Sequence, residues 1–149
     1  ETVTQIAAFK DVVGLFFGAA DASASLGCKL AWEPLLYARQ RVVLAASMFN
    51  LFTIDAPYFY IDKMAGLKEE AEKVKNLGFT GKAAIHPDQI DHINEAFSPS
   101  AEEKEEAKKV LEEYQKSGGG AIKVDGQMID EPIAEAMRLK ITLGEEEKD

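Results

Sequence analysis

Short apolar segments alternate with longer amphipathic segments along the first two thirds of this sequence, and this alternation limits the possible folds more than any other feature. The apolar segments cover residues 11–17, 52–56 and 81–85, and each has the length and composition of a buried strand. A helical pattern follows each of them after a short connection. The alternation predicts an α/β fold with a parallel sheet and right-handed connections. Three strands are too few to close an eight-stranded barrel.

Helices are predicted from apolar spacing and from residues that favour helix ends. Residues 2–9 are typical of the last turns of a helix. Residues 33–50 place apolar side chains at helical spacing, and Pro34 suits the first turn, where its missing N–H has no effect. Another helix ends at Gly78 in the usual manner of a C-terminal glycine. The next begins at Asp88, and its inward side chains are expected to be Ile90, Ile93 and Phe97.

The last third of the chain has a different character, which predicts a domain boundary between residues 97 and 98. Ser100 and Glu103 form a capping box for a helix over 101–116, with an inward face of Ala107, Val110, Leu111 and Tyr114. Asp125 and Gly126 are typical of a two-residue hairpin turn. Asp130 is expected to cap a final helix over 131–143, and an acidic tail follows.

Composition excludes several classes of function. The 149 residues carry 26 acidic and 17 basic side chains, for a net charge of −9, and show no basic patch that would suit nucleic acid. No apolar run approaches the roughly 20 residues that span a membrane. The single Cys28 excludes an intrachain disulfide and fits a reducing cytoplasm. Because the chain starts inside a helical pattern at Glu1, we expect it to be the later part of a longer protein.

The first apolar segment leads into the strongest candidate for chemistry, Asp21. It follows the break at Gly18, and in a βα barrel the active site lies at the carboxyl ends of the strands. An acid at that place could hold a hard cation such as Mg²⁺ together with oxygens of the substrate. The alternative is that Asp21 caps a helix beginning at Ala22, with Ser23 or Ser25 sharing the task.

Six stretches occur in the order and spacing of one known family. They are FGAADASASLG (17–27), LYARQRVVLAA (36–46), TIDAPY (53–58), GFTGKAAIHPDQI (78–90), FSPS (97–100) and DGQMIDEPIAEAMR (125–138). Together they resemble the C-terminal half of the citrate lyase beta-subunit-like family of CoA-ester lyases, which includes malyl-CoA, methylmalyl-CoA and citramalyl-CoA lyases. The resemblance implies the later strands of a (β/α)₈ TIM barrel, a partial barrel, over residues 1–97, and a C-terminal helix–hairpin–helix extension over 98–149.

The resemblance also implies Mg²⁺ as cofactor and assigns roles to two aspartates. Asp21 matches the second of the family's two metal-binding acids. The first, a glutamate, and an arginine that holds the substrate carboxylate belong to earlier strands of the family and have no counterpart in this sequence. Asp130 matches the aspartate that a neighbouring subunit's C-terminal segment brings over the active site as a lid. A plain N-cap is the alternative for Asp130, and the two interpretations are compatible.

Two further stretches resemble loops that line the CoA side of the barrel. The residues expected to bind substrate or CoA there are Asp55, Lys82, His86 and Pro87. At such a position a histidine is more often a hydrogen-bonded loop residue than a general base. The aromatic loop 58–60 either stacks on an adenine or packs against neighbouring strands, and Arg39 is expected to be solvated or salt-bridged.

These features favour a cytoplasmic, Mg²⁺-dependent lyase that cleaves or forms a 3-hydroxyacyl-CoA, such as malyl-CoA or citramalyl-CoA, from an acyl-CoA and a 2-oxo acid. The alternative is a non-catalytic subunit or interaction module that keeps the fold and CoA affinity. The resemblance implies a homo-oligomer, a trimer or hexamer. A missing N-terminal half or a partner chain is expected to complete the barrel, so the chain alone should be inactive.

Overall fold

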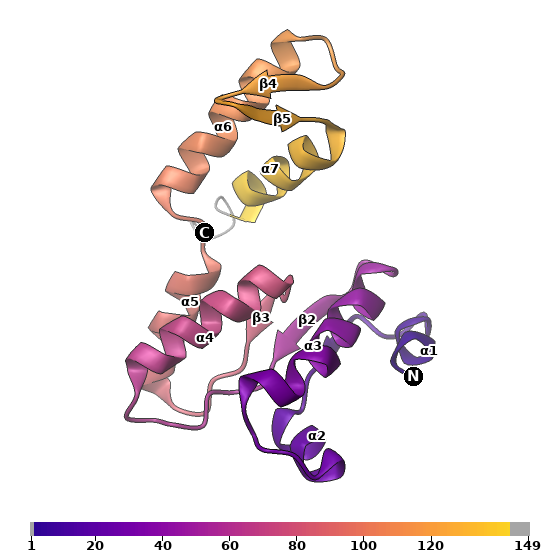
Figure 1. The fold of residues 1–149 in the computed structure, drawn as a ribbon, viewed down its shortest axis with the longest axis vertical. Helices are drawn as coiled ribbons and strands as arrows, with labels where there is room; N and C mark the ends of the chain where they lie inside the picture. Colours follow the sequence, from indigo (N-terminus) through magenta and orange to yellow (C-terminus); the bar gives the residue numbers. More distant parts are fainter. Residues whose placement is uncertain (1, 144–149) are drawn as a thin grey trace. The chain divides into compact units, whose positions relative to one another are not determined.

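The computed structural model describes residues 2–143, which form two compact units that divide between Phe97 and Ser98 (Figure 1). The elements of the first unit are α1 (Val3–Ala7), β1 (Gly14–Phe16), α2 (Ala19–Leu26), α3 (Trp32–Ser47), β2 (Phe52–Asp55), α4 (Met64–Leu77), β3 (Gly81–Lys82), the 3₁₀ turn η1 (Pro87–Gln89) and α5 (Ile90–Phe97). Those of the second are α6 (Ala101–Lys116), β4 (Ile122–Val124), β5 (Gln127–Ile129) and α7 (Glu131–Leu143).

The first unit is built on a three-stranded sheet in the order β1-β2-β3, with both pairs parallel. Leu15 lies opposite Thr53, and Asp55 lies opposite Lys82. The α/β fold and the parallel sheet predicted from the alternation are therefore confirmed. The strands are shorter than predicted, because backbone pairing stops at Phe16 in β1 and at Lys82 in β3. Since all strands run the same way, their carboxyl ends meet at one edge.

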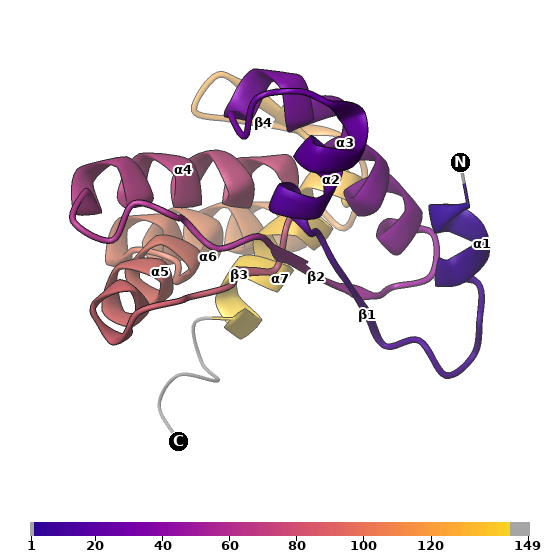
Figure 2. The ribbon, with the colours of Figure 1, turned by 90° about the horizontal axis from the view of Figure 1, so that it is seen from below.

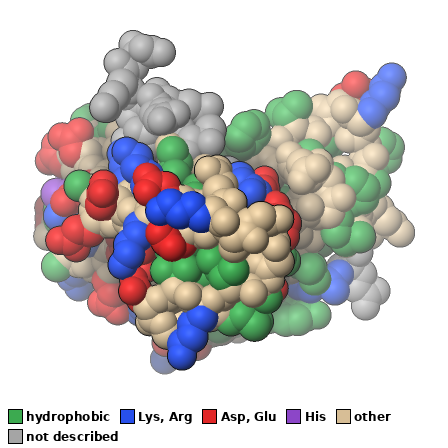
Figure 3. Space-filling view, turned by 90° about the horizontal axis from the view of Figure 1, so that it is seen from above, with side chains coloured by type: hydrophobic (Ala, Val, Ile, Leu, Met, Phe, Trp, Pro, Cys, Tyr) green, Lys and Arg blue, Asp and Glu red, His purple; other side chains and the backbone are tan. Residues whose placement is uncertain are grey.

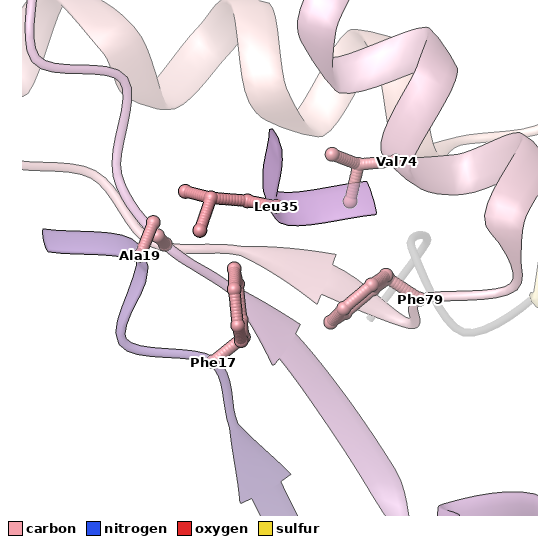
Figure 4. Close-up of a cluster of buried hydrophobic side chains, with 6 residues drawn as sticks. Phe17, Ala19, Leu35, Val74 and Phe79 are labelled. Carbon is pink, nitrogen blue, oxygen red and sulfur yellow. The ribbon is translucent and has the colours of Figure 1, made fainter. Parts of the chain in front are cut away.

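One face of the sheet carries the core of this unit. Helices α3 and α4 lie on that face (Figure 2). Leu35 from α3 and Val74 from α4 pack against Phe17, Ala19 and Phe79, and all five side chains are nearly or completely buried (Figure 4). The apolar positions that predicted these helices are thus the positions that bury them against the sheet.

The other face of the sheet is open, which corrects the prediction that 11–17 is a strand buried on both faces. Phe16 and Phe52, which have the same orientation in paired strands, are 60% and 68% exposed. Successive strand residues point to opposite faces, so Phe17 reaches the helix-covered face and Phe16 the open one. Within the described residues, helices cover one face of these strands. The apolar sequence pattern does not show which face is left uncovered.

Ile90 was expected to face inward, but it is 48% exposed. The chain after β3 first forms the 3₁₀ turn Pro87–Gln89 and only then the α-helix. Because that turn changes the angular phase of the residues that follow, the buried positions become Gln89, Ile93 and Ala96. The inward position of Ile93 was predicted correctly.

The second unit matches the pattern predicted for it closely. The capping box of α6 is complete, since Ser100 Oγ accepts from the Glu103 N–H and the Glu103 carboxylate accepts from the Ser100 N–H. Asp125 and Gly126 have φ angles of 47° and 90° and close the antiparallel hairpin β4–β5. The core is apolar and comprises Val110, Leu111, Tyr114, Val124, Ile129 and Ala134.

Charged side chains of both signs lie interleaved on the face of the molecule in Figure 3, without an extended patch of either sign. No helix among the described residues is long and apolar enough to cross a membrane.

Candidate active site

Three connections leave the carboxyl edge of the parallel sheet and carry most of the residues predicted to be functional. Residues 17–21 follow β1, residues 56–63 follow β2 and residues 83–87 follow β3. In α/β proteins with parallel strands, ligands bind at this edge. The positions of the candidate side chains relative to the edge therefore decide what the first unit can do.

Asp21 lies in the first turn of α2, which begins at Ala19 with Gly18 as its N-cap. The alternative that Asp21 caps a helix starting at Ala22 is therefore wrong. Its side chain is exposed, and no hydrogen bond or ion pair links its carboxylate to any other described residue. A Cβ at Gly18 would come within 3.0 Å of Asp21 Oδ2. The glycine thus leaves room beside the carboxylate, which stays free to bind a ligand.

A magnesium ion can use Asp21 as one ligand. Mg²⁺ is often bound through one or two carboxylates while the remaining positions are filled by water and substrate oxygens. A search of the described residues found no group of three or more His, Cys, Asp or Glu side chains that could hold a metal. Asp21 therefore fits the ion as one ligand, with water and substrate oxygens at other positions.

Asp55 and Lys82 belong to a buried charged cluster between the sheet and the helices. The Asp55 carboxylate accepts hydrogen bonds from Arg39 Nε at 2.8 Å and from Lys82 Nζ at 2.9 Å. Lys82 Nζ also donates to Glu70 Oε1 at 2.7 Å and to the carbonyl oxygen of Ala56 at 2.7 Å. The side chains of Asp55 and Lys82 are completely buried. Two cations and two anions thus neutralise one another inside the first unit.

The guanidinium group of Arg39 lies between two aromatic rings. Its central carbon is 5.0 Å from the ring centre of Phe17 and 4.9 Å from that of Trp32. Stacking of this kind favours arginine over lysine at a buried site. Its Nη1 atom is buried without a hydrogen-bond partner. Of the alternatives for Arg39, the salt-bridged one is confirmed.

The cluster joins parts of the chain that are far apart in sequence. Asp55 stands at the end of β2 and Lys82 at the end of β3, while Arg39 and Glu70 come from α3 and α4. In this arrangement the charged groups of Asp55 and Lys82 face each other and not solvent. Their visible role is to position the carboxyl edge, and direct contact with substrate or CoA stays a prediction for both.

His86 and Pro87 form the start of the turn after β3. His86 is half-buried, and its Nδ1 accepts a hydrogen bond from the Asp88 N–H at 3.3 Å, which caps η1. The same nitrogen lies 3.6 Å from Asp88 Oδ2. The structure thus gives His86 the hydrogen-bonded loop role, and a further role in binding or proton transfer stays a prediction. Pro87 is exposed at the first position of the turn.

The aromatic loop after β2 lies beside a small cavity of about 40 Å³. The rings of Tyr58 and Tyr60 are in edge-to-face contact with their centres 5.5 Å apart. Burial, followed by the nearby charge of Glu70, raises the pKa of the Tyr58 hydroxyl. The cavity is lined by Ala19, Leu30, Ala31, Leu35, Arg39, Pro57, Tyr58, Phe59, Tyr60 and Glu70. Tyr58 and Tyr60 pack on each other within the loop, while packing against neighbouring strands and stacking on an adenine both stay predictions.

Gln89 is a residue at this edge to which the sequence interpretation gave no role. Its side chain is completely buried, and its amide bonds to the backbone of two different loops. A signal was present, because Gln89, Ile93 and Ala96 share one face at helical spacing. A polar residue on an otherwise apolar face indicates a buried hydrogen-bonding role.

Asp130 belongs to the second unit, at the junction of β5 and α7. Its Oδ1 accepts a hydrogen bond from the Ile133 N–H at 3.3 Å, so the predicted N-cap is confirmed. Beside it, Glu131 accepts from the Tyr114 hydroxyl at 2.9 Å and from Arg138 at 2.7 Å. These two bonds, that from Arg138 first, lower the pKa of Glu131. The half-buried carboxylate of Asp130 keeps Oδ2 available for another task.

Comparison with known sequence families assigns the chain. Residues 1–87 match the family described as HpcH/HpaI aldolase/citrate lyase. The chain belongs to this family. The resemblance drawn from the six stretches is therefore confirmed.

Two similar proteins carry related names. The chain is 39% identical to human mitochondrial citramalyl-CoA lyase over 144 residues, which cover 93% of this chain and 42% of that protein. It is 34% identical to the citrate lyase beta subunit of Haemophilus influenzae over 137 residues, or 89% of this chain and 47% of that one. The chain thus spans less than half of the length of these two relatives.

A solved structure extends the likeness to three dimensions. The Mycobacterium tuberculosis protein CitE, solved in complex with magnesium, acetoacetate and coenzyme A, matches with a TM-score of 0.86 and 32% identity. The match covers 96% of this chain and 56% of CitE.

Proposed function

We propose that this chain supplies part of the active site of a Mg²⁺-dependent lyase that cleaves, or forms, a 3-hydroxyacyl-CoA such as malyl-CoA or citramalyl-CoA. The products of cleavage are an acyl-CoA and a 2-oxo acid. The observation that carries the proposal is Asp21, an exposed and unpaired carboxylate at the carboxyl edge of the sheet in a member of this family. A solved relative that contains magnesium, acetoacetate and coenzyme A supports the choice of cofactor and ligand class.

The reaction defines what the residues have to do. Cleavage breaks the bond between the thioester α-carbon and the carbon that bears the hydroxyl group. The hydroxyl proton passes to water, that carbon becomes the carbonyl of the 2-oxo acid, and the bonding electron pair passes to the α-carbon as an enolate. A proton delivered to the α-carbon completes the acyl-CoA. When bound, Mg²⁺ supplies polarisation of the substrate oxygens and stabilises negative charge.

Two aspartates divide this work in the proposal. The Asp21 carboxylate serves as a metal ligand, for which its freedom from protein partners suits it. Asp130 moves the proton at the α-carbon, a task for a carboxyl group shielded from water. Its Oδ1 is committed to the Ile133 N–H, so the proton would be held on Oδ2. Asp130 acts in this scheme from the C-terminal segment of a neighbouring subunit.

The remaining elements of the proposal concern the assembly. The first unit represents later strands of a TIM barrel, whose open sheet face, marked by Phe16 and Phe52, is covered once further strands are present. Asp55, Lys82, His86 and Pro87 contribute to the CoA side, the first two by holding the loops in place. A homo-oligomer, a trimer or hexamer, brings Asp130 to the site. The single Cys28 suits a reducing compartment, and we propose the cytoplasm.

The test is a cleavage assay on the protein that contains this chain, with malyl-CoA and citramalyl-CoA as substrates and with or without Mg²⁺. Asp21→Asn should lower kcat roughly 100-fold or more, because a few kcal/mol of charge stabilisation is lost. Asp11→Asn is the matched control, since Asp11 is also exposed but precedes β1 at the opposite end of the strand. Equal losses in the two variants would contradict the metal role of Asp21.

Asp130→Asn separates the proton role from the cap. Asparagine caps a helix as well as aspartate does, so stability should be unchanged while kcat falls by about 10²–10⁴-fold. An unchanged kcat would contradict the catalytic role. CoA binding by the wild-type protein without turnover of either substrate would contradict the lyase and indicate a non-catalytic module.

A further inference from the structure

One buried side chain joins the loop after β2 to the loop after β3. Gln89 Nε2 donates to the carbonyl oxygen of Tyr58 at 2.8 Å, and Gln89 Oε1 accepts from the Ile85 N–H at 2.9 Å. Tyr58 and Gln89 are separated by 31 residues in sequence. We call these two bonds the Gln89 bridge. It closes both loops onto the first turn after β3.

The chemistry of the bridge requires a side chain that both donates and accepts. One loop offers a donor and the other an acceptor, and only a side chain with both functions satisfies the two. Gln89 itself is completely buried, and both of its bonds are at least partly buried. If the amide is removed, the Ile85 N–H and the Tyr58 carbonyl lose this partner, which favours a shift of the loops.

Other contacts hold the loop after β2. Lys82 Nζ donates to the carbonyl oxygen of Ala56, immediately before the first loop. The hydroxyl of Tyr58 lies against Gly66 in α4, where a Cβ would overlap it. Tyr58 also lines the small cavity beside Arg39. The loop after β2 is therefore fixed at its start, at the Tyr58 side chain and, through the bridge, at the Tyr58 backbone.

We propose that Gln89 is a positioning residue that holds loops 57–63 and 83–87 together as one rigid wall at the carboxyl edge, against which the CoA ester is aligned. This inference rests on the proposed function, because the wall borders the site in which Asp21 would bind the metal. Gln89 itself does not touch the reacting atoms. It acts through the backbone of Tyr58 and Ile85.

The test uses Gln89→Glu in the full protein, because this substitution keeps the shape and makes the bridge depend on pH. A protonated carboxyl accepts from the Ile85 N–H and donates to the Tyr58 carbonyl, as the amide does. An ionised carboxyl has no donor and repels that carbonyl. Burial raises the pKa of a carboxyl group by several units, so the group introduced at this position is expected to be protonated at about pH 6 and ionised at about pH 9.

The expected result is a selective loss at high pH. Relative to wild type at the same pH, kcat/KM of Gln89→Glu should fall about 10- to 100-fold near pH 9, because misplaced groups at a site lower rates by such factors. Near pH 6 it should return to within about twofold of wild type, as the bridge re-forms. His86 and Asp88 lie in the same turn as Gln89 and Tyr58 is bonded to it, and wild type at the same pH is the reference that accounts for these ionisable neighbours.

Gln89→Met is the matched control, since it keeps length and burial but can form neither bond. It should be impaired equally at both pH values. Exchange of the Ile85 amide hydrogen provides a readout besides activity: it should be faster than wild type in Gln89→Met at both pH values and in Gln89→Glu only near pH 9.

The outcomes separate this proposal from the proposed function. A kcat/KM of Gln89→Glu that equals wild type at both pH values overturns the positioning role. The role is also overturned if kcat/KM of Gln89→Glu stays low near pH 6 although the Ile85 amide is protected from exchange again. If wild type cleaves neither substrate, the proposed function fails, and CoA affinity then tests the positioning role of Gln89. A CoA affinity of Gln89→Glu that falls near pH 9 and recovers near pH 6 supports that role. An unchanged CoA affinity overturns it.

Discussion

The two units of this chain differ in that only the first, among the described residues, buries charged side chains. In the first unit, Arg39, Asp55 and Lys82 are buried between the sheet and its helices, 3%, 0% and 6% exposed. In the second, the pairs Lys109–Asp125 and Lys116–Glu113 are on the surface, and the interior is apolar. Both units form α-helices on small sheets, but they are specified by different interactions.

This difference determines which unit tolerates change. A buried ion cluster requires every partner, because removing one leaves an uncompensated charge away from water. Exposed ion pairs contribute little, since water solvates whichever partner remains. In the first unit, the buried ion cluster therefore fixes the residues at the carboxyl edge, where the candidate site lies, but substitutions within the cluster are poorly tolerated. The second unit depends on apolar packing and helix caps, which tolerate conservative substitutions.

The largest effect should come from breaking the buried cluster with Asp55→Asn. The variant keeps the shape of the side chain but leaves Arg39 and Lys82 with Glu70 as their one remaining anion in the cluster. Loss of one partner of a buried pair lowers the free energy of unfolding by about 3–5 kcal/mol. Urea unfolding followed by the fluorescence of Trp32, the single tryptophan in the sequence, measures it directly, because Trp32 stacks on Arg39.

Asp125→Asn is the matched change in the second unit. It removes the exposed pair with Lys109, and asparagine tolerates the positive φ of 47° at this turn. No shift of the urea midpoint is expected, as monitored by far-UV circular dichroism. A comparable loss in both variants would contradict the contrast between buried and exposed charges.

A smaller effect is expected from Gly66→Ala. The informative result is whether the free energy of unfolding rises or falls. An alanine in a helix ordinarily stabilises it by about 1 kcal/mol relative to glycine. At position 66 the added Cβ would overlap the Tyr58 hydroxyl, so the ring has to move. We expect a net loss of about 1–3 kcal/mol, measured by thermal unfolding.

Tyr58→Phe provides the control for this overpacking. Without the hydroxyl, most of the overlap disappears, so adding Gly66→Ala in that background should cost clearly less than it does in wild type. Equal losses in both backgrounds would show that the Tyr58 side chain does not fix the loop after β2.

What the sequence could and could not predict follows the same division. Helix α6, its cap at Ser100 and the Asp125–Gly126 turn were predicted from local residues, because each depends on neighbours within a few positions. The parallel sheet was predicted from the alternation of segments. These predictions need no knowledge of tertiary contacts, and the structure confirms them.

The missed features are those that depend on residues far apart in sequence. Asp55, Arg39 and Lys82 meet only because β2, β3 and α3 pack together, and no local pattern shows that their charges cancel. The exposed face at Phe16 could not be told from a buried one, since an apolar strand looks the same in both cases. Asp21 was placed correctly after the first strand, but the start of α2 at Ala19 was missed because Gly18, with no side-chain cap, precedes it.

Among the substitutions expected to destabilise the protein, the smallest effect should come from the N-cap of α6. Ser100→Ala removes the oxygen that accepts from the Glu103 N–H, and it should lower the free energy of unfolding of the second unit by about 1 kcal/mol. Ser100→Asp keeps an acceptor at the N-cap and places a negative charge near the helix N-terminus, so it should retain wild-type stability. Amide exchange across 101–116, compared with that across 64–77, localises the change. The cap was predicted from neighbouring residues, so its effect should be local: α6 should lose protection from exchange while α4 keeps it. Loss of protection in α4 as well would mean that the two units unfold together, and that their different interactions do not make them independent.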